Sequence, residues 1–440
     1  MKKVKLLVAI VCLMCMESCK EQPSKADIRI LTDQNLLHQN MHQLTEVIIH
    51  DVFSPPVASR IYVYTSLAAY EALRFNQPGY PSITTQLSDF GTMPLPEKDK
   101  TYNYLLAATK AFFTVAEKIT FSADTLNNYQ KKVYTDFVSL IDKEIYDRSI
   151  AFGEAVGKKI LERTTQDNYK QTRGMPKNLG SNEPGKWRPT PPDYLDGGEP
   201  WWQKIKPMVA GAQFKCPAPP VYSKDTNSTF YKTVSEVYTI GKNLTEEQKT
   251  IARYWDDNPF VIEHAGHLMY GNKKITPVGH WIGIAGIACK MKNLNPVETA
   301  QTYVLTSIAI FDSFISCWDD KYKSMLVRPV TVINEWFDHN WQPFLQTPPF
   351  PEHPSGHSAI SAASATVLTS LFGDGFSFED TSDLKYIGMK RKFQSFNQAA
   401  MEASISRVYG GIHYRTGVDA GAEQGRAIGN YVVNRLKLRE

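Results

Sequence analysis

Apolar residues recur at the three- and four-residue spacing of an α-helix along most of this 440-residue chain, and this periodicity constrains its fold more than any other feature. The sequence contains no run of alternating strands and no internal repeat of fixed period. It therefore predicts an all-α fold, a helical bundle. Helices are expected over residues 39–53, 57–75, 98–117, 122–141, 143–165, 296–320, 358–372, 390–407 and 420–438, with another starting after Thr245.

Two of these helices carry clear start signals. Thr245 and Gln248 form the Ser/Thr-x-x-Glu/Gln pattern of a capping box. Asn295 followed by Pro296 predicts an N-cap with proline at the first helical position, where its missing N–H would be unpaired anyway. The second of these helices is expected to deliver Lys321 at its C-terminal end.

Residues 166–228 have a different composition, because prolines, glycines and tryptophans crowd together there. The segments 187–192 (Trp-Arg-Pro-Thr-Pro-Pro) and 200–202 (Pro-Trp-Trp) are examples. So many aromatic residues would be unusual in a flexible linker. The stretch is therefore predicted to be a long ordered loop that packs against the helical body and roofs a pocket.

The overall composition is that of a globular protein, with 42% hydrophobic and 12% aromatic residues. The chain is long enough for one or two domains. Its net charge of +4 is spread without a long basic run, so nothing favours nucleic acid as a partner. Cys216, Cys289 and Cys317 form no C-x-x-C pair, which indicates buried free thiols rather than disulfides or a zinc ribbon.

The first nineteen residues have the pattern of a secretory signal peptide. Three lysines within the first five residues precede an apolar stretch, 6–16, that is too short to span a membrane as a mature helix. A small residue directly before Cys19 resembles a bacterial lipobox, although Glu17 departs from the usual pattern. Cys19 is thus the expected lipidation site, and a plain cleaved signal or an uncleaved anchor is the alternative.

The expected organisation is a signal peptide over 1–19, a tether over 20–38 and a single α-helical domain over 39–440, with its core motifs in 295–438. The protein is expected to be exported, as a bacterial outer-membrane or periplasmic lipoprotein that meets the membrane only through its lipid. Residues 299–318 are the most apolar later segment, but Gln301 and Asp312 within them indicate a buried helix rather than a membrane span.

Three short segments near the C-terminus together suit an oxyanion. They are Lys321 with Arg328-Pro329, then Pro354-Ser355-Gly356-His357, then Ser406-Arg407 with His413. Three cations, a hydroxyl and a glycine N–H near a helix start can hold a tetrahedral or trigonal-bipyramidal anion, which leaves two imidazoles for chemistry. The site is therefore expected within the C-terminal helices. His357 should lie at a helix N-terminus, where the helix dipole would lower its pKa.

These segments resemble the signature of the superfamily that unites type 2 phosphatidic-acid phosphatases and vanadium-dependent haloperoxidases. Residues 54–60, 187–192 and 348–351 look like its soluble, haloperoxidase-like branch. The resemblance thus extends over most of the chain after about residue 40. The membrane-embedded lipid phosphatases are disfavoured, because that branch needs several membrane-spanning helices.

The resemblance implies a role for each matching residue. The oxyanion oxygens would be held by Lys321, Arg328, Ser355, Gly356 and Arg407. His413 would be the axial residue, bonded to vanadium in a peroxidase or attacking phosphorus in a phosphatase. His357 would be the acid–base partner on the opposite side.

The function that the resemblance implies first is that of a vanadium haloperoxidase, which binds vanadate as cofactor and oxidises a halide with hydrogen peroxide. An acid phosphatase that hydrolyses phosphomonoesters through a phosphohistidine, without a cofactor, is the alternative. A non-catalytic oxyanion-binding lipoprotein is the second alternative. Vanadate and phosphate need the same ligands, so the sequence does not choose between them, and it leaves the halide, the organic substrate and the oligomeric state undetermined.

Two carboxylates are expected to support the site. The family pattern has Asp four residues after the second His, but Gly417 stands there, and Asp419 is the nearest carboxylate that could orient His413. A backbone carbonyl is the other option. Asp312, within an apolar stretch, needs a partner and is expected to contact Arg407 or His357; the alternative is a separate structural pair.

The remaining histidines give a weaker signal. Residues 263–267 (Glu-His-Ala-Gly-His), with His280 nearby, lack the spacing of a zinc protease motif, so a zinc site is disfavoured. One of these histidines, or His353, is expected to line the pocket entrance. The alternative is an ordinary surface or core histidine.

Overall fold

Helices build most of the structure, which is a computed structural model. It describes Asp33 and residues 35–439, except for residues 212, 260, 266 and 272. The side chains of residues 262–265 and 268–271 are also outside the description. The α-helices are α3 (Asn35–His50), α4 (Pro55–Leu73), α5 (Tyr104–Ile119), α6 (Ala123–Leu140), α7 (Lys143–Thr164), α8 (Tyr169–Arg173), α9 (Thr229–Lys242), α10 (Glu246–Tyr254), α11 (Pro277–Met291), α12 (Pro296–Ser324), α13 (Pro329–Trp336), α14 (Gly356–Phe372), α15 (Leu384–Ile387), α16 (Phe396–Tyr409) and α17 (Arg415–Arg435). Short 3₁₀ turns lie at Arg74–Asn76, Thr84–Gln86 and Trp202–Lys204. Two antiparallel hairpins complete the described part: β1 (Ile262–Ala265) with β2 (Leu268–Gly271), and β3 (Phe378–Asp380) with β4 (Arg391–Phe393).

The predicted helical fold is confirmed, with one clear error. The range 390–407 does not begin as a helix, because Arg391–Phe393 pair with β3, and Ser395 then caps α16 by accepting the Gln398 N–H. Both expected helix starts are present, since Thr245 and Asn295 each form a complete capping box. The sequence did not reveal α8, α9, α11, α13, α15 or the two hairpins.

The N-terminal targeting segment that the sequence predicts lies almost entirely outside the residues that the structure describes. The signal peptide, Cys19 and most of the tether lie outside the described residues, so export and lipidation stay predictions. None of the described helices is both long and apolar enough to cross a membrane. The three body cysteines are free thiols; Cys289 and Cys317 are buried and Cys216 is half-buried.

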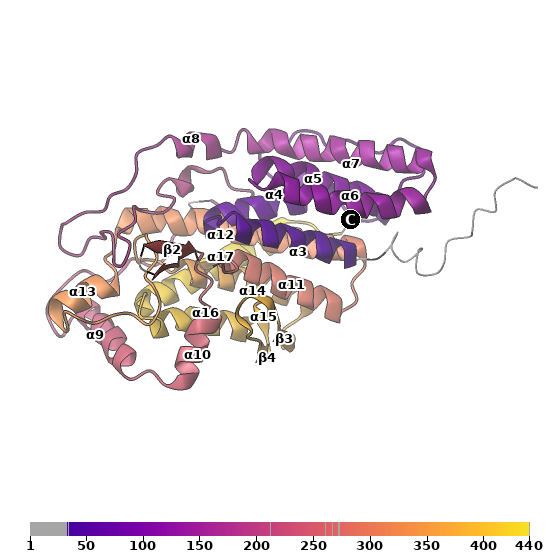
Figure 1. Cartoon of the computed structure of the whole chain (residues 1–440). Helices are drawn as coiled ribbons and strands as arrows, with labels where there is room; N and C mark the ends of the chain where they lie inside the picture. Colours follow the sequence, from indigo (N-terminus) through magenta and orange to yellow (C-terminus); the bar gives the residue numbers. More distant parts are fainter. Residues whose placement is uncertain are drawn as a thin grey trace, which may run out of the picture.

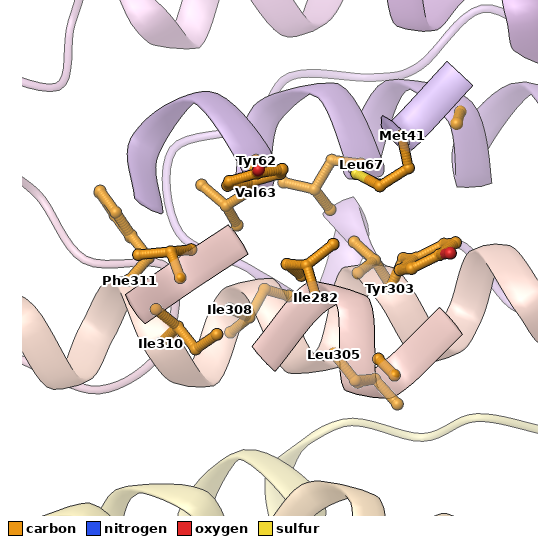
Figure 2. Packing of buried hydrophobic residues seen from close by; sticks show 14 of the residues in the cluster. Met41, Tyr62, Val63, Leu67, Ile282, Tyr303, Leu305, Ile308, Ile310 and Phe311 are labelled. Atoms are coloured by element: carbon orange, nitrogen blue, oxygen red, sulfur yellow. The ribbon is translucent and has the colours of Figure 1, made fainter. Parts of the chain in front are cut away.

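The helix α12 runs through the middle of the molecule and positions the site. Helices α3 and α4 pack on one side of it, with α5, α6 and α7 beyond them, while α14, α16 and α17 lie on the other side (Figure 1). On the α4 side, Tyr62 and Val63 face Ile308 and Phe311 of α12 (Figure 2). The largest buried cluster contains residues from Leu36 to Leu436, so the N- and C-terminal helices share one hydrophobic core.

The close crossing of α14 and α17 brings the predicted catalytic segments together. Four glycines recur every fourth residue on the face of α17 that meets α14: Gly417, Gly421, Gly425 and Gly429. A Cβ built at Gly425 would overlap the carbonyl oxygen of Ala359 and lie 2.8 Å from its carbonyl carbon. Because α14 also consists largely of small residues, as its sequence predicts, the two backbones touch and their N-terminal ends lie side by side, where Ser355 N donates to Gly417 O at 2.9 Å.

We expect Gly425→Ala to destabilise the protein although alanine is the better helix former. The added methyl would push α17 away from α14, at a cost of about 1–3 kcal/mol of overpacking. Urea unfolding measures the change in the free energy of unfolding, with Ala427→Ser on the exposed face of the same helix as the matched control. Equal stability of Gly425→Ala and the parent protein would contradict the close crossing.

The long segment 166–228 is ordered, as predicted. Arg60 donates from Nε to Asp167 Oδ2 at 2.6 Å, and Arg163 donates to the carbonyls of Lys206 and Pro207. Trp187 and Trp202 are fully buried. These contacts fasten the loop to α4, α7 and α12.

Candidate active site

The expected site is a pocket at the N-terminal ends of α14 and α17. It is lined by Pro55, Asp257, Asn258, Pro259, Pro277, Phe314, Trp318, Pro348, Phe350, Gly356, His357, Arg407, Ile412 and His413. Four of the predicted site residues are thus brought together: Gly356, His357, Arg407 and His413. The segment 166–228 was expected to cover a pocket, but none of its described residues lines this one.

His413 has a defined ring orientation. Gly411 before it adopts a φ of 74°, in the left-handed region that glycine tolerates, so the chain turns there from α16 towards α17. Arg328 Nη1 lies 3.1 Å from Nε2, and Glu352 Oε1 lies 2.7 Å from Nδ1. Since arginine can only donate, Nε2 is the accepting nitrogen and Nδ1 carries the proton.

Both site histidines are neutral in this structure. Burial, and then the charge of Arg328, holds the pKa of His413 well below its usual range. Burial, and then the charge of Arg407, does the same to the pKa of His357. The predicted direction for His357 is correct, with desolvation as the leading cause. The contact between His413 and Glu352 is accordingly a hydrogen bond with a neutral imidazole.

Three buried side-chain nitrogens of the predicted site residues have no hydrogen-bond partner among the described residues. They are Arg328 Nη2, Arg407 Nε and His357 Nε2. Leaving a buried donor or acceptor unpaired costs about 1–3 kcal/mol, more for a charged group. A bound oxyanion would satisfy all three, so the residues present fit a vanadate or phosphate group.

The two arginines are held from behind by backbone carbonyls. Arg328, the N-cap of α13, donates to Phe350 O at 2.8 Å and to Ile412 O at 2.7 Å. Arg407 donates from Nη1 to Trp255 O, and it lies in the last turn of α16. Burial lowers the pKa of Arg328 to about 10 and also lowers that of Arg407, yet both remain cations at neutral pH.

Ser355 and Gly356 supply neutral donors. Ser355 caps α14, and its Oγ accepts from Ser358 N at 3.3 Å and Ser358 Oγ at 3.0 Å, so its own proton is free to be donated. Gly356 is the first residue of α14, where the N–H has no intrahelical acceptor. The start of α14 is therefore suited to an anion.

Lys321 differs from its expected role. Its buried Nζ donates to the carbonyls of Pro351 at 2.9 Å, Glu352 at 3.1 Å and Pro354. All three ammonium donors are thus used on the loop before α14, and burial lowers the pKa of Lys321 to about 8. A direct bond to an oxyanion would require Lys321 to release one of these carbonyls.

The carboxylate beside His413 comes from Glu352 and not from Asp419. Asp419 is exposed on α17, two residues beyond Gly417, and the expectation that it orients His413 is wrong. Glu352 is fully buried, and its Oε1 also accepts the Tyr414 N–H at 3.0 Å. Burial raises the pKa of Glu352 to about 7, against the opposing effect of Arg328 and Lys321.

Asp312 does not reach Arg407 or His357, so the expected link is wrong. Its carboxylate accepts the backbone N–H groups of Met208, Val209 and Ala210 at 2.8, 2.8 and 2.7 Å. Burial raises the pKa of Asp312 to about 7, although these three donors favour the charged form. The residue therefore anchors the long loop rather than the pocket.

We expect Asp312→Ala to destabilise the protein without weakening oxyanion binding. Three buried N–H groups would lose their acceptor, at a cost of at least about 1–3 kcal/mol. Asp312→Asn, which keeps one accepting oxygen, should cost less. Urea unfolding gives the stability and vanadate titration gives the affinity; a loss of affinity in a folded Asp312→Asn variant would restore the link to the pocket.

The other histidines whose side chains the structure describes lie away from the pocket lining. The side chains of residues 263 and 264 and residue 266 lie outside the described part, and His267 is exposed. His353 is buried with Nε2 2.8 Å from Pro217 O and 3.4 Å from Cys216 Sγ, behind the loop. None of the described histidines other than His357 and His413 lines the pocket.

His280 is the centre of a buried ion cluster. Its Nε2 lies 2.8 Å from Asp380, and its Nδ1 lies 3.1 Å from Asp257 and 3.5 Å from Asp383. Burial opposes protonation, but the three carboxylates outweigh it and raise the pKa of His280 well above its usual range. Atoms of Asp257, His280 and Asp383 are close enough to share a metal ion, yet the two ring nitrogens of His280 already hydrogen-bond Asp257 and Asp380.

Sequence reasoning missed two contributors to the site. Glu352 follows a run of prolines and aromatics, and the absent carboxylate at Gly417 was a signal that another acid must replace it. Trp255 acts through its carbonyl, which any residue type could supply, so no sequence pattern could reveal it. The ring of Trp255 stacks on His280 with centroids 4.5 Å apart, which joins the ion cluster to Arg407.

Comparison with known proteins places these features in a family. A family model described as the VCPO second helical-bundle domain matches residues 301–439. The crystal structure described as that of the first bacterial vanadium-dependent iodoperoxidase is 44% identical, with a TM-score of 0.88, over 92% of this chain and 98% of that chain. The comparison with curated proteins gave no significant match.

Two further crystal structures share the fold at lower identity. The holo-type bacterial vanadium-dependent chloroperoxidase is 18% identical with a TM-score of 0.68, covering 88% of this chain and 93% of that chain. The apo-type structure is also 18% identical, with a TM-score of 0.66 over 87% and 94% of the two chains. Since the relative at 44% identity spans nearly the whole chain, the protein belongs to the vanadium-dependent haloperoxidase family that its motifs resemble.

Proposed function

We propose that this protein binds vanadate at His413 and oxidises a halide with hydrogen peroxide. The observation that carries the proposal is the set of three buried, unpaired groups, Arg328 Nη2, Arg407 Nε and His357 Nε2, around the accepting Nε2 of His413. The relative at 44% identity is described as an iodoperoxidase, so iodide is the halide that we propose first.

Each residue has a defined task in this proposal. When bound, vanadate would supply a Lewis acid that activates hydrogen peroxide without a change of metal oxidation state. Arg328 and Arg407 would hold its oxygens with charge-assisted hydrogen bonds, and the Ser355 hydroxyl and Gly356 N–H would add neutral ones. His413 would offer the lone pair of Nε2, because its proton sits on Nδ1; Arg328 Nη1, which donates to this lone pair in the anion-free structure, would have to release it when the anion binds.

His357 would move protons on the opposite side. Its Nε2 is buried without a partner, and burial together with Arg407 keeps the ring neutral, so it can accept a proton during turnover and return it. Phe314, Trp318 and Phe350 form the apolar wall of the pocket and would limit water there. Oriented donors act more strongly where water is excluded.

The alternatives differ in what they predict. An acid phosphatase would use the same donors for a phosphomonoester, with His413 as nucleophile. The non-catalytic oxyanion-binding alternative depended on the missing carboxylate at Gly417. Glu352 lies in contact with His413, so a carboxylate beside this ring is not missing, which counts against lost turnover.

The decisive experiment uses protein lacking residues 1–19, stripped of anions and then supplied with vanadate. Peroxide-dependent oxidation of iodide and bromide is followed, with hydrolysis of p-nitrophenyl phosphate in a parallel vanadate-free sample. Halide oxidation that requires vanadate is the expected result. Phosphate release without halide oxidation, with vanadate only inhibiting, would identify a phosphatase, and inertness in both assays would identify a binding protein.

A further inference from the structure

The tautomer of the His413 ring determines whether its Nε2 can bind the central atom of an oxyanion. Only the tautomer with its proton on Nδ1 has a lone pair on Nε2, the nitrogen beside Arg328. The 2.7 Å contact with Glu352 Oε1 gives the Nδ1 proton an acceptor and holds the ring plane. Without that acceptor, the ring could rotate or carry its proton on the wrong nitrogen.

Glu352 is itself held from three directions. Its Oε1 accepts the N–H of Tyr414, the N-cap of α17, where the helix dipole favours a negative charge. Its backbone N–H donates to Leu326 O at 2.9 Å, and Lys321 Nζ donates to its carbonyl at 3.1 Å. The Glu352 carboxylate is therefore held by the same parts of the chain that carry Lys321, Arg328 and His413.

The glycine at position 417 makes room for this carboxylate. A Cβ built at Gly417 would overlap Glu352 Oε1 and lie 2.8 Å from Oε2. A side chain at 417 and the carboxylate of Glu352 thus exclude each other from the same volume. An aspartate at 417, the residue that the family pattern places there, would put its own carboxylate into this space from the α17 side.

We propose that Glu352 is the positioning residue of His413 and that Glu352 and Gly417 form a matched pair, in which the carboxylate has moved from α17 to the loop before α14. Glu352 touches no substrate and acts through the His413 ring. The inference rests on the proposed function for the identity of the anion, vanadate, but not for the contact with His413.

The test is a carboxylate swap. Glu352→Ala is expected to weaken vanadate binding by about 10- to 100-fold, as losses of residues that orient metal ligands typically do. Gly417→Asp alone should also weaken it, because two carboxylates would compete for one space. The double variant Glu352→Ala/Gly417→Asp should recover most of the loss. Asp419→Ala, which removes an exposed carboxylate from the same helix, is the control and should bind like the parent.

A second readout does not depend on vanadate. In anion-free protein labelled with ¹⁵N-histidine, the His413 Nδ1–H signal, identified by its loss in His413→Ala, should be present in the parent, absent in Glu352→Ala and restored in the double variant. If the parent binds no vanadate, the proposed function fails, while this signal still decides the role of Glu352.

Two results would overturn the inference. One is a Glu352→Ala variant that keeps the Nδ1–H signal and the parent's vanadate affinity. The other is a folded double variant that recovers neither. If Glu352→Ala does not fold, Glu352→Met keeps most of the side-chain volume and removes the acceptor of the Nδ1 proton. It should still bind vanadate more weakly than the parent, and unchanged binding there would reject the proposal.

Discussion

His413→Ala is expected to abolish vanadate-dependent halide oxidation, with a fall in kcat of at least about 10³-fold. The Nε2 lone pair of His413 is the accepting nitrogen at the centre of the site, between Arg328 and the pocket, and no described neighbour can replace it. Vanadate affinity should fall together with activity, because the same atom binds and activates the anion. Steady-state kinetics with iodide and a vanadate titration measure the two effects.

His357→Ala separates binding from catalysis in the same assays. This variant removes the unpaired Nε2 that we propose to transfer protons, but leaves Arg328, Arg407 and His413 in place. We expect vanadate to bind while kcat falls by about 10²–10⁴-fold. Full activity in His413→Ala, or identical binding losses in both variants, would contradict the assignment of the two histidines.

Arg328→Lys is expected to produce the second largest effect. Arg328 spans the site with three nitrogens: Nε and Nη1 are fixed by carbonyls and by His413, and Nη2 is left for an anion. Lysine retains the charge but cannot make this fork. Vanadate affinity should fall by about 10- to 100-fold, or about 1.5–3 kcal/mol, the typical value of a hydrogen bond to a charged group.

The matched control for this variant is Arg188→Lys. Arg188 is part of a half-exposed surface ion pair with Glu335, whereas Arg328 is buried against His413, so the same substitution at 188 should leave vanadate affinity unchanged. Equal affinities of Arg328→Lys and Arg188→Lys would show that the unpaired Nη2 of Arg328 is not a ligand of the anion.

The helices and the motif residues could be predicted from the sequence because both depend on local patterns. Helical periodicity and capping pairs such as Asn295 with Glu298 act within one turn. The segment Ser355–His357 forms a helix start that can be recognised in isolation. The helix predicted at 391–393 was wrong for a physical reason. Arg391 and Lys392 are compatible with a helix or a strand, and the strand forms only because this segment pairs with β3.

The supporting contacts could not be predicted because they join distant parts of the chain. Glu352 and His413 are 61 positions apart, and Asp312 reaches backbone N–H groups more than 100 residues earlier. A backbone donor has no sequence signature, so the buried carboxylate of Asp312 suggested a charged partner instead. Lys321 likewise meets carbonyls of the loop before α14, which its motif does not reveal.

The proposed function requires vanadate to occupy the space between His413 and the two arginines. The most direct test is a crystal structure of the protein grown with vanadate, with anomalous data that locate vanadium. We expect vanadium bonded to His413 Nε2, with Arg328 Nη2 and Arg407 Nε within hydrogen-bond distance of its oxygens. Vanadium bound elsewhere, or a pocket in which these two nitrogens stay unpaired at saturating vanadate, would contradict it.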